Sequence, residues 1–198
     1  MKNQRGGAGV LLLVIMCFLI ITTATFSTVN HFTYTNKYNT AVKAMERAVT
    51  SAIQEVNISE DSVEIKKDES INVFLDSFSR NTGLENLSVL EDKLYFLIVD
   101  AEIDSGENVS LNHYLKKYGE DGNIENLSKN STTIKGILEN EIPDIEIRIH
   151  EYKSREFKNQ PYFVAVVKDW NLGGLFTRRS LVFNNMSAST LDIVFEYE

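Results

Sequence analysis

The stretch "GAGVLLLVIMCFLIITTATFSTVNHF", residues 7–32, decides the architecture of this chain of 198 residues. No charged side chain occurs from Gly6 to Asn36, and the strongly apolar part covers residues 8–29. A helix of that length rises about 30 Å at about 1.5 Å per residue, which matches the hydrocarbon thickness of a bilayer. The stretch therefore predicts a transmembrane helix.

Basic residues lie on one side of this segment. Lys2 and Arg5 precede it, and the next positive charge along the chain is Lys37. Because basic residues that flank a membrane segment stay on the cytoplasmic side, residues 1–7 are expected in the cytoplasm and the C-terminal domain outside it. The sequence thus predicts a single-pass protein of the cell membrane, with the lipid bilayer as a partner.

Two interpretations of the segment are open. The basic tip, the apolar core Val10–Ile21 and the small residues up to Ala24 also fit a secretory signal that is cleaved after Ala24. An uncleaved anchor is favoured because the uncharged stretch continues through residues 26–32 and then enters a helical pattern almost without a break.

The pattern after the apolar stretch is that of an amphipathic helix over residues 30–57. Apolar residues recur there in steps of 4 and 3, which is the spacing of a coiled-coil seam. The residues of this seam are Tyr38, Val42, Met45, Val49, Ala52 and Val56. Neither proline nor glycine occurs between Val10 and Ile58, so one helix, or two nearly collinear ones, can run from the bilayer into the body. The seam either packs against a partner or packs the helix on its own domain.

The segment "KNQRGGAGVLLLVIMCFLIITTATFSTVNHFTYTNKYNTAVKAMERAVTSAIQEV" joins a basic tip with small residues to an apolar helix and an amphipathic continuation. In this layout it resembles the N-termini of type IV pilin-like proteins, particularly TadE-type pseudopilins. The residues that carry the resemblance are Arg5, Gly6, Gly7, Ala8 and the apolar run behind them. The resemblance implies cleavage by a prepilin peptidase near Gly6, Gly7 or Ala8. It also implies that the helix packs against other membrane or pilin-like subunits.

Proteins of these families usually carry a glutamate a few residues after the cleavage site, where in a filament it meets a neighbour's N-terminal amine. Here the apolar residues 10–13 fill that region, and the first acidic residue of the chain is Glu46. A buried ion pair of that kind specifies register. Its absence favours a pilin-like membrane subunit that does not polymerise.

Charge is unevenly distributed along the chain. Residues 1–36 hold two basic residues, which leaves 18 of the 20 basic and all 28 acidic residues, a net charge of −10, in the remainder. An acidic body argues against binding to a phosphate backbone, so no nucleic-acid partner is expected. The single cysteine, Cys17, lies inside the apolar run, which excludes a disulfide within the chain and thiolate metal sites in the body.

The body, residues 58–198, is predicted to be an α+β domain with a mostly antiparallel sheet and helices on one face. A helix is expected where apolar residues recur at one-turn spacing, and these residues are Ile71, Phe74, Leu75 and Phe78. Asp68 or Ser70 is expected to cap its start, and Gly83 to end it.

Strands are expected around Val63–Ile65 and over 93–103, where a continuous apolar run indicates that both faces are covered. Further helices are expected near 111–118 and over 132–140. The last third predicts strands joined by short turns, among them the turn "NNMSAS" at 184–189. The ranges of these strands are 144–152, 161–170, 175–183 and 190–198.

No catalytic constellation occurs in the sequence. The histidines are His31, His113 and His150. Their spacing forms no metal motif, and each is expected to be solvated, with His113 in a helix. Asp100, Glu102 and Asp104 alternate at a strand end and could bind a cation, but they lack the calcium-loop pattern. We expect no enzymatic activity, no cofactor and no metal.

These features predict a pilin-like single-pass membrane protein that serves as a structural or assembly subunit of a bacterial cell-surface or secretion apparatus. One alternative is a membrane-tethered extracytoplasmic module that binds or senses a ligand. Another is a secreted domain whose signal peptide is removed.

Overall fold

The computed structural model of the protein describes residues 4–59, 61–103, 109–120, 125–126, 136, 160–172 and 182–191. The chain forms two compact units. The first comprises Met1–Tyr38 with Asn171–Leu181, and the second comprises Asn39–Trp170 with Val182–Glu198. Helix α1, Gln4–Ala52, contributes its residues up to Tyr38 to the first unit and its last turns to the second.

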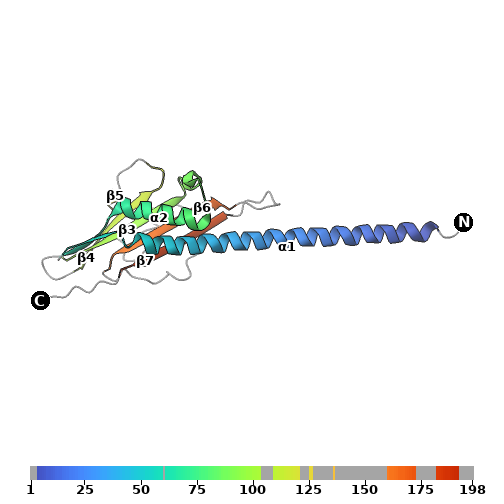
Figure 1. Cartoon of the computed structure of the whole chain (residues 1–198), viewed down its shortest axis with the longest axis horizontal. Coiled ribbons are helices and arrows are strands. Elements are labelled where there is room, and N and C mark those ends of the chain that lie inside the picture. The colour runs from blue at the N-terminus through green and yellow to red at the C-terminus, as the bar shows by residue number, and fades with distance from the viewer. Residues whose placement is uncertain are drawn as a thin grey trace. The chain divides into compact units, whose positions relative to one another are not determined.

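The described elements after α1 form an α+β domain (Figure 1), as the sequence predicts. They are β1 (Val56–Ile58), β2 (Ser62–Ile65), α2 (Lys67–Thr82), the 3-10 helix η1 (Leu87–Leu90), β3 (Leu94–Ile103), β4 (Val109–Lys117), β5 (Glu125–Asn126), β6 (Tyr162–Asn171) and β7 (Val182–Thr190).

Strand β3 is the centre of the sheet. One of its edges pairs with β4 along nearly its whole length, from Tyr95 to Ile103. The other edge is divided, because residues 94–99 pair with β6 whereas Ala101 and Glu102 pair with β2. β1 then extends the sheet from β2, β5 from β4, and β7 from β6. The pairs β1–β2, β2–β3, β3–β4, β3–β6 and β4–β5 are antiparallel, which confirms the predicted sheet type.

The end of α1 and helix α2 pack on one face of the sheet. Aromatic rings fill the space beneath α2, and the ring of Phe74 lies 5.1 Å from that of Phe96 on β3 and 6.1 Å from that of Phe163 on β6. From α1, the Met45 sulfur accepts a hydrogen bond from the Asn185 amide of β7. The aromatic face of α2 is therefore core, where offset and edge-on rings pack favourably.

A single residue changes the alternation of β6 and adds a tryptophan to this core. Asp169 has a φ of 56°, and its backbone N–H donates to the Asn184 side chain of β7. After this kink Trp170 lies on the helix-covered face, where its ring centroid is 5.9 Å from that of Phe78 and 5.5 Å from that of Phe183. An extra residue in one strand has this effect, because it turns the following side chain to the other face.

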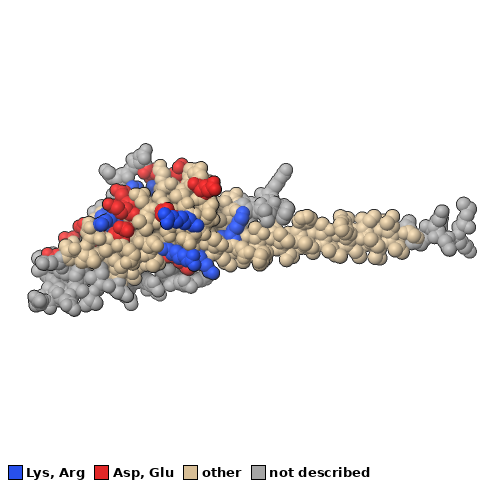
Figure 2. Space-filling model, viewed as in Figure 1, with Lys and Arg blue, Asp and Glu red and all other residues tan. Residues whose placement is uncertain are grey.

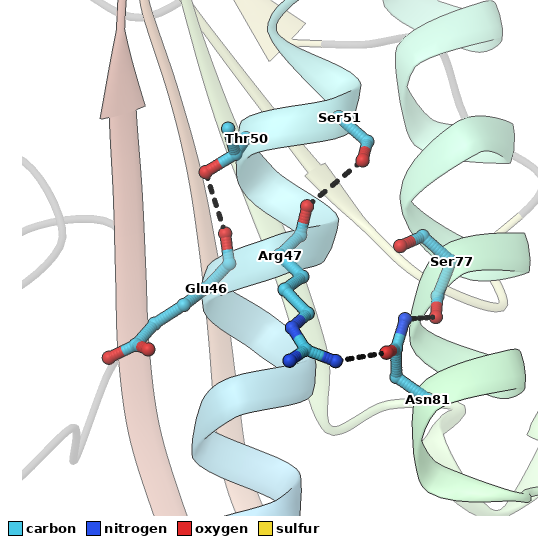
Figure 3. A pocket seen from close by; sticks show the side chains of 6 residues that line it. All are labelled: Glu46, Arg47, Thr50, Ser51, Ser77 and Asn81. Carbon is cyan, nitrogen blue, oxygen red and sulfur yellow. Dashed lines mark hydrogen bonds between the residues drawn. The ribbon is translucent and has the colours of Figure 1, made fainter.

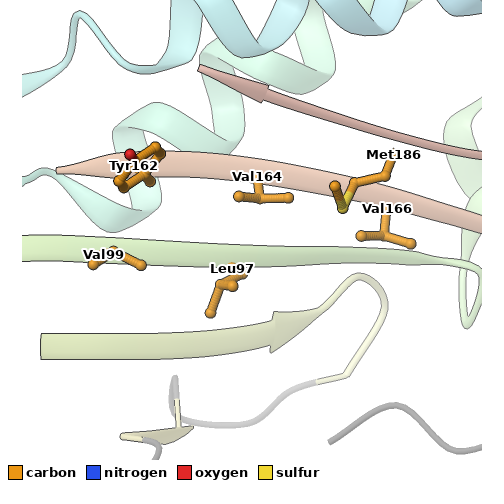
Figure 4. Packing of buried hydrophobic residues seen from close by; sticks show 6 residues of the cluster. All are labelled: Leu97, Val99, Tyr162, Val164, Val166 and Met186. Carbon is orange, nitrogen blue, oxygen red and sulfur yellow. The ribbon is translucent and has the colours of Figure 1, made fainter. Parts of the chain in front are cut away.

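The opposite face of β3 and β6 is also apolar and buried (Figure 4). Leu97 and Val99 of β3 are register partners of Val164 and Tyr162 of β6, so the four side chains share a face. Met186 of β7 joins them. Because both faces of β3 are covered, its sequence is a continuous apolar run rather than an alternating one, as expected for residues 93–103.

Helix α2 confirms the predicted core face and the predicted end. Ile71, Phe74 and Phe78 are buried, and Gly83 closes the helix with a φ of 71°, a conformation that favours glycine. Its start differs from the prediction. The N-cap residue is Lys66, which makes no side-chain capping bond, and Ser70 lies inside the helix and donates to the Lys67 carbonyl.

Two further predictions about local structure are wrong. Residues 111–118 lie in and just after strand β4 instead of in a helix, because Leu111, His113 and Leu115 alternate along a strand that completes the edge of β3. The segment "NNMSAS" forms part of β7 instead of a turn, since pairing with β6 extends the strand through Thr190. The predicted strand around Val63–Ile65 is confirmed as β2.

Several predicted elements fall on residues that the structure does not describe. They are the strand at 144–152, most of the helix at 132–140, the first part of the strand at 175–183, and most of the strand at 190–198. The predicted strand at 161–170 is confirmed as β6.

Candidate functional site

The first unit presents an apolar helix whose side chains are exposed. The large apolar residues from Val10 to Ile21 are between 51 and 68 % exposed. Among the described residues, α1 is the one helix long and apolar enough to cross a membrane. A helix that is apolar on all sides is stable only where every side is covered by protein core or lipid. The part of the chain that the structure describes provides no such cover for these side chains.

Five threonine hydroxyls of this segment are satisfied within the helix. Threonine hydroxyls donate to the backbone carbonyl four residues earlier, at 2.5–3.0 Å, and these residues are Thr22, Thr23, Thr25, Thr28 and Thr35. Such bonds let a hydroxyl reside in hydrocarbon without an external partner. Together with the absence of charged residues from Gly6 to Asn36, these bonds make the segment chemically compatible with a bilayer interior. Figure 2 shows no Lys, Arg, Asp or Glu side chains along the extended part of α1 in this view.

The surface chemistry of α1 changes within two turns after the apolar segment. Phe32 is 66 % exposed, and then Tyr34 and Tyr38 bring their ring centroids to 6.0 Å from each other. Between these tyrosines, the Lys37 ammonium donates to the Leu172 carbonyl at 3.3 Å. Uncharged apolar surface therefore gives way to amphipathic rings and a cation.

The candidate processing residues Gly6, Gly7 and Ala8 lie in the first turns of α1, which begins at Gln4. At Gly7 and Gly9 an added methyl group would meet no atom within 4 Å. Close packing within this chain therefore does not explain the glycines, which helix propensity alone disfavours by about 1 kcal/mol each relative to alanine.

The structure divides the predicted helix seam. Met45, Val49 and Ala52 are buried in the second unit, together with Ala41, Ala44 and Ala48 of the same helix. Tyr38 and Val42 are half-buried. The inclusion of Val56, and the extension of the helix to residue 57, are wrong, because α1 ends at Ala52 and Val56 begins β1. The sequence left open whether the seam packs against a partner or on its own domain. The buried residues fit packing on its own domain.

A shallow polar groove lies between the last turns of α1 and helix α2 (Figure 3). Its lining residues are Glu46, Arg47, Thr50, Ser51, Ser77 and Asn81. The Arg47 guanidinium donates to the Asn81 side-chain oxygen at 3.0 Å, whereas Glu46 points away from α2. The Thr50 and Ser51 hydroxyls donate to carbonyls of their own helix.

The polar contact in this groove is an interhelical hydrogen bond. Its lining has one side-chain bond across it, from Arg47 to Asn81, and contains neither a histidine nor a cysteine. A nucleophile requires an adjacent base to activate it, whereas the Thr50 and Ser51 hydroxyls of the groove donate to carbonyls of their own helix.

The most connected polar side chain of the core is Asp100 on β3. Its carboxylate is almost fully buried, accepts the Ile65 backbone N–H at 2.8 Å and pairs with the Lys67 ammonium at 2.9 Å. The same ammonium lies 4.1 Å from the centroid of the Tyr114 ring. Burial raises the pKa of Asp100 above its ordinary value, although the bonds from Ile65 and Lys67 oppose this. The pair joins the start of α2 to β3.

This arrangement changes the interpretation of the acidic residues near the end of β3. Asp100 is held by Lys67 and Ile65, and Glu102 is exposed and accepts a hydrogen bond from Asn112. Asp104 lies outside the described residues. Among the residues that the structure describes, no cluster of three metal-ligating side chains occurs. A charged residue within a strand covered on both faces was the sequence signal that could have indicated the Asp100–Lys67 pair.

The two histidines that the structure describes lie on different elements. His31 is exposed on α1, His113 is buried on β4, and His150 lies outside the described residues. The prediction that His113 is solvated and helical is wrong, because it faces the same side of the sheet as its register partner Val99.

Comparisons with family models, with curated proteins and with solved structures found no match to this chain. The fold and the exposed helix are therefore the basis for any functional conclusion.

Proposed function

We propose that this protein is a pilin-like single-pass membrane protein that serves as a structural or assembly subunit of a bacterial cell-surface or secretion apparatus. The observation that carries the proposal is the composition of α1. One helix, Gln4–Ala52, contains both an exposed uncharged segment long enough for a bilayer and a segment buried in a folded domain.

Charge supports an orientation with the domain outside the cytoplasm. Lys2 and Arg5 are the basic residues before the apolar segment, and the remainder of the chain has a net charge of −10. The positive-inside tendency assigns the N-terminus to the cytoplasm. The small residues Gly6, Gly7 and Ala8 after Arg5 are the proposed processing region.

A secreted domain with a cleaved signal is the weaker alternative. Cleavage after Ala24 would leave Phe26, Val29 and Phe32 at the new N-terminus, and these are 50, 42 and 66 % exposed. A soluble product would then display these apolar side chains together, which favours association or aggregation.

Fractionation of cells that produce the full chain tests the proposal. We expect the protein in the membrane pellet after alkaline carbonate extraction, and we expect protease added from outside to degrade the domain. Mass spectrometry then identifies the mature N-terminus. A start within or just after Gly6–Ala8 supports pilin-type processing, an intact Met1 supports a plain anchor, and a soluble product that starts at Thr25 overturns both.

Crosslinking distinguishes an assembly subunit from an isolated tether. A photoreactive residue replacing the exposed Phe18 is expected to join the chain to another membrane protein or to a second copy. The same group replacing Ile58, which is 73 % exposed on β1, is the control and should not give that product. Crosslinking to lipid alone from position 18 would contradict the assembly role.

A tethered binding module is the second candidate, and the groove between α1 and α2 is the feature that favours it. The polar side chains of Arg47, Ser77 and Asn81 border it. If a ligand binds there, Arg47→Ala should abolish binding while the crosslink from position 18 persists. If the crosslink is lost instead, the groove belongs to the assembly contacts.

A further inference from the structure

The two basic positions that flank the uncharged part of α1 are separated by about one bilayer. Arg5 and Lys37 are 32 positions apart in the helix, which corresponds to about 48 Å at about 1.5 Å per residue. A bilayer with its headgroup regions is about 40–45 Å thick. If the helix is tilted by about 25°, which is within the usual range for membrane helices, the distance between the two positions along the bilayer normal equals the bilayer thickness. Both positions can then lie at headgroup level in opposite leaflets.

The residues around Lys37 have the composition of a membrane interface. Tyr34 and Tyr38 are half-buried, one turn apart, and their rings are in contact range at 6.0 Å between centroids. Tyrosine is enriched at headgroup level, where its ring meets acyl chains and its hydroxyl meets water. Phe32, two residues before Tyr34, is 66 % exposed and carries no polar group. The change from lipid-compatible to interfacial chemistry therefore occurs between Phe32 and Lys37.

The Lys37 ammonium can bind an anionic group in addition to its protein partner. Lys37 is exposed and donates one hydrogen bond, at 3.3 Å, to the Leu172 carbonyl. An ammonium group has three donors, and lysine side chains near helix ends extend their charge toward lipid headgroups. Two donors therefore remain for phosphate oxygens at the level of the tyrosine rings.

We propose that Tyr34, Lys37 and Tyr38 form an interfacial anchor that holds phospholipid headgroups on the domain side of the bilayer, with the Lys37 ammonium on a lipid phosphate. This inference rests on the proposed function and adds the depth of the helix, with the hydrocarbon boundary between Phe32 and Asn36. The occupant is phospholipid, because the segment before it is uncharged and exposed over a length that matches a bilayer.

Spin-label depth measurement on the full chain in phosphatidylcholine–phosphatidylglycerol vesicles tests the boundary. Single labels are placed by Thr28→Cys, Phe32→Cys, Asn36→Cys and Thr40→Cys in a chain that also carries Cys17→Ala. We expect labels at 28 and 32 to favour collisions with oxygen and labels at 36 and 40 to favour collisions with a water-soluble nickel reagent. A boundary displaced by a turn or more in either direction overturns the proposal.

Other outcomes distinguish a failure of the proposed function from a failure of the phospholipid anchor alone. If all four labels collide with the nickel reagent, the helix does not enter the bilayer and the proposed function fails as well. If the labels at 28 and 32 are shielded from both reagents, neighbouring protein covers the segment and the phospholipid anchor is wrong.

Lys37→Gln tests the role of the cation. Without the charge, the boundary is expected to move toward position 40 by two residues or more, with a larger shift in vesicles that contain phosphatidylglycerol than in pure phosphatidylcholine. Lys43→Gln is the matched control, since Lys43 is also an exposed lysine of α1. Equal boundaries in the two variants would overturn the assignment of Lys37 to the headgroups.

Discussion

Helix α1 contains two regions with the same backbone structure and opposite surroundings. From Val10 to Ile21 its large apolar side chains are more than half exposed, whereas Ala41, Met45 and Ala48 in its last turns are at most 1 % exposed. The first region is apolar on every side. The second region is apolar along one stripe, and Lys43 and Glu46 lie on its exposed side. The comparison teaches that the distribution of apolar residues around a helix, rather than their number, determines whether the helix is buried by its own domain.

The largest expected effect breaks the first region. Leu13→Arg combined with Phe18→Arg places two charges within the apolar segment, each costing about 2.5–3.5 kcal/mol near a bilayer centre. We expect the protein to leave the membrane fraction while the circular dichroism melting temperature of the domain is unchanged. Ile58→Arg, a charge at an exposed site on β1, is the control and should remain in the membrane. A double variant that resists carbonate extraction would contradict the assignment of this region to lipid.

Methionine truncation compares the two regions directly. Met45 is fully buried and Met16 is 55 % exposed. Met45→Ala is expected to destabilise the domain by about 3 kcal/mol, because it leaves a cavity beneath α1, whereas Met16→Ala should not change the domain's unfolding. Chemical denaturation in detergent, followed by the fluorescence of Trp170, measures both. Equal effects would show that the last turns of α1 are not part of the cooperative unit.

The same contrast extends to ion pairs. Lys67 pairs with the nearly buried Asp100, whereas Lys116 pairs with Asp68, whose side chain is 74 % exposed. Lys67→Met is expected to destabilise the domain by about 3 kcal/mol at pH 8, because it leaves a buried carboxylate without its cation. Lys116→Met should cost less than about 1 kcal/mol. A comparable cost for the two variants would contradict the structural role of the Asp100–Lys67 pair.

The pH dependence follows from the raised pKa of Asp100. The folded state binds this proton more tightly than the unfolded state, so this group favours folding below the ordinary carboxyl pKa and loses that contribution as pH rises through the folded pKa. Lys67 lowers the pKa of Asp100, so its removal raises that pKa further. We expect the destabilisation by Lys67→Met to be larger at pH 8 than at pH 5, and urea titrations at both pH values measure this. The reverse order would show that Asp100 is not the group responsible.

The smallest expected effect concerns the groove between α1 and α2. Arg47→Ala removes an exposed bond to Asn81 and is expected to lower the melting temperature by a few degrees at most, corresponding to about 0.5–1 kcal/mol. Lys43→Ala, on the same helix but outside the groove, is the control and should have no effect. A loss of several kcal/mol would mean that the two helices depend on this contact.

Elements with a strong periodicity were predictable from the sequence, and elements that depend on a distant partner were not. The apolar run at 93–103 and the face with Ile71, Phe74 and Phe78 predict β3 and α2, because burial on both faces or on one side leaves a direct pattern. Residues 111–118 were predicted as a helix, although Leu111, His113 and Leu115 alternate along β4. Its pairing with β3 establishes the strand.

The features of α1 and of the polar core likewise include some that the sequence indicated and some that it did not. The uncharged stretch before Lys37 and the seam residues Met45, Val49 and Ala52 were recognisable from composition and spacing. The end of α1 at Ala52, the transfer of Val56 to β1 and the pairing of Lys67 with Asp100 were not.

The sequence by itself determined that the chain has an uncharged segment of bilayer length, followed by an acidic α+β domain, because charge, hydropathy and period are properties of the residues themselves. Only the tertiary structure decided which residues from elsewhere in the chain cover each buried side. It buried Asp100 beside Lys67, turned Trp170 into the helix-covered core through the kink at Asp169, and placed Met45 in the domain's own core. The physical reason is that burial depends on contacts between residues far apart in the chain, and local sequence does not encode them.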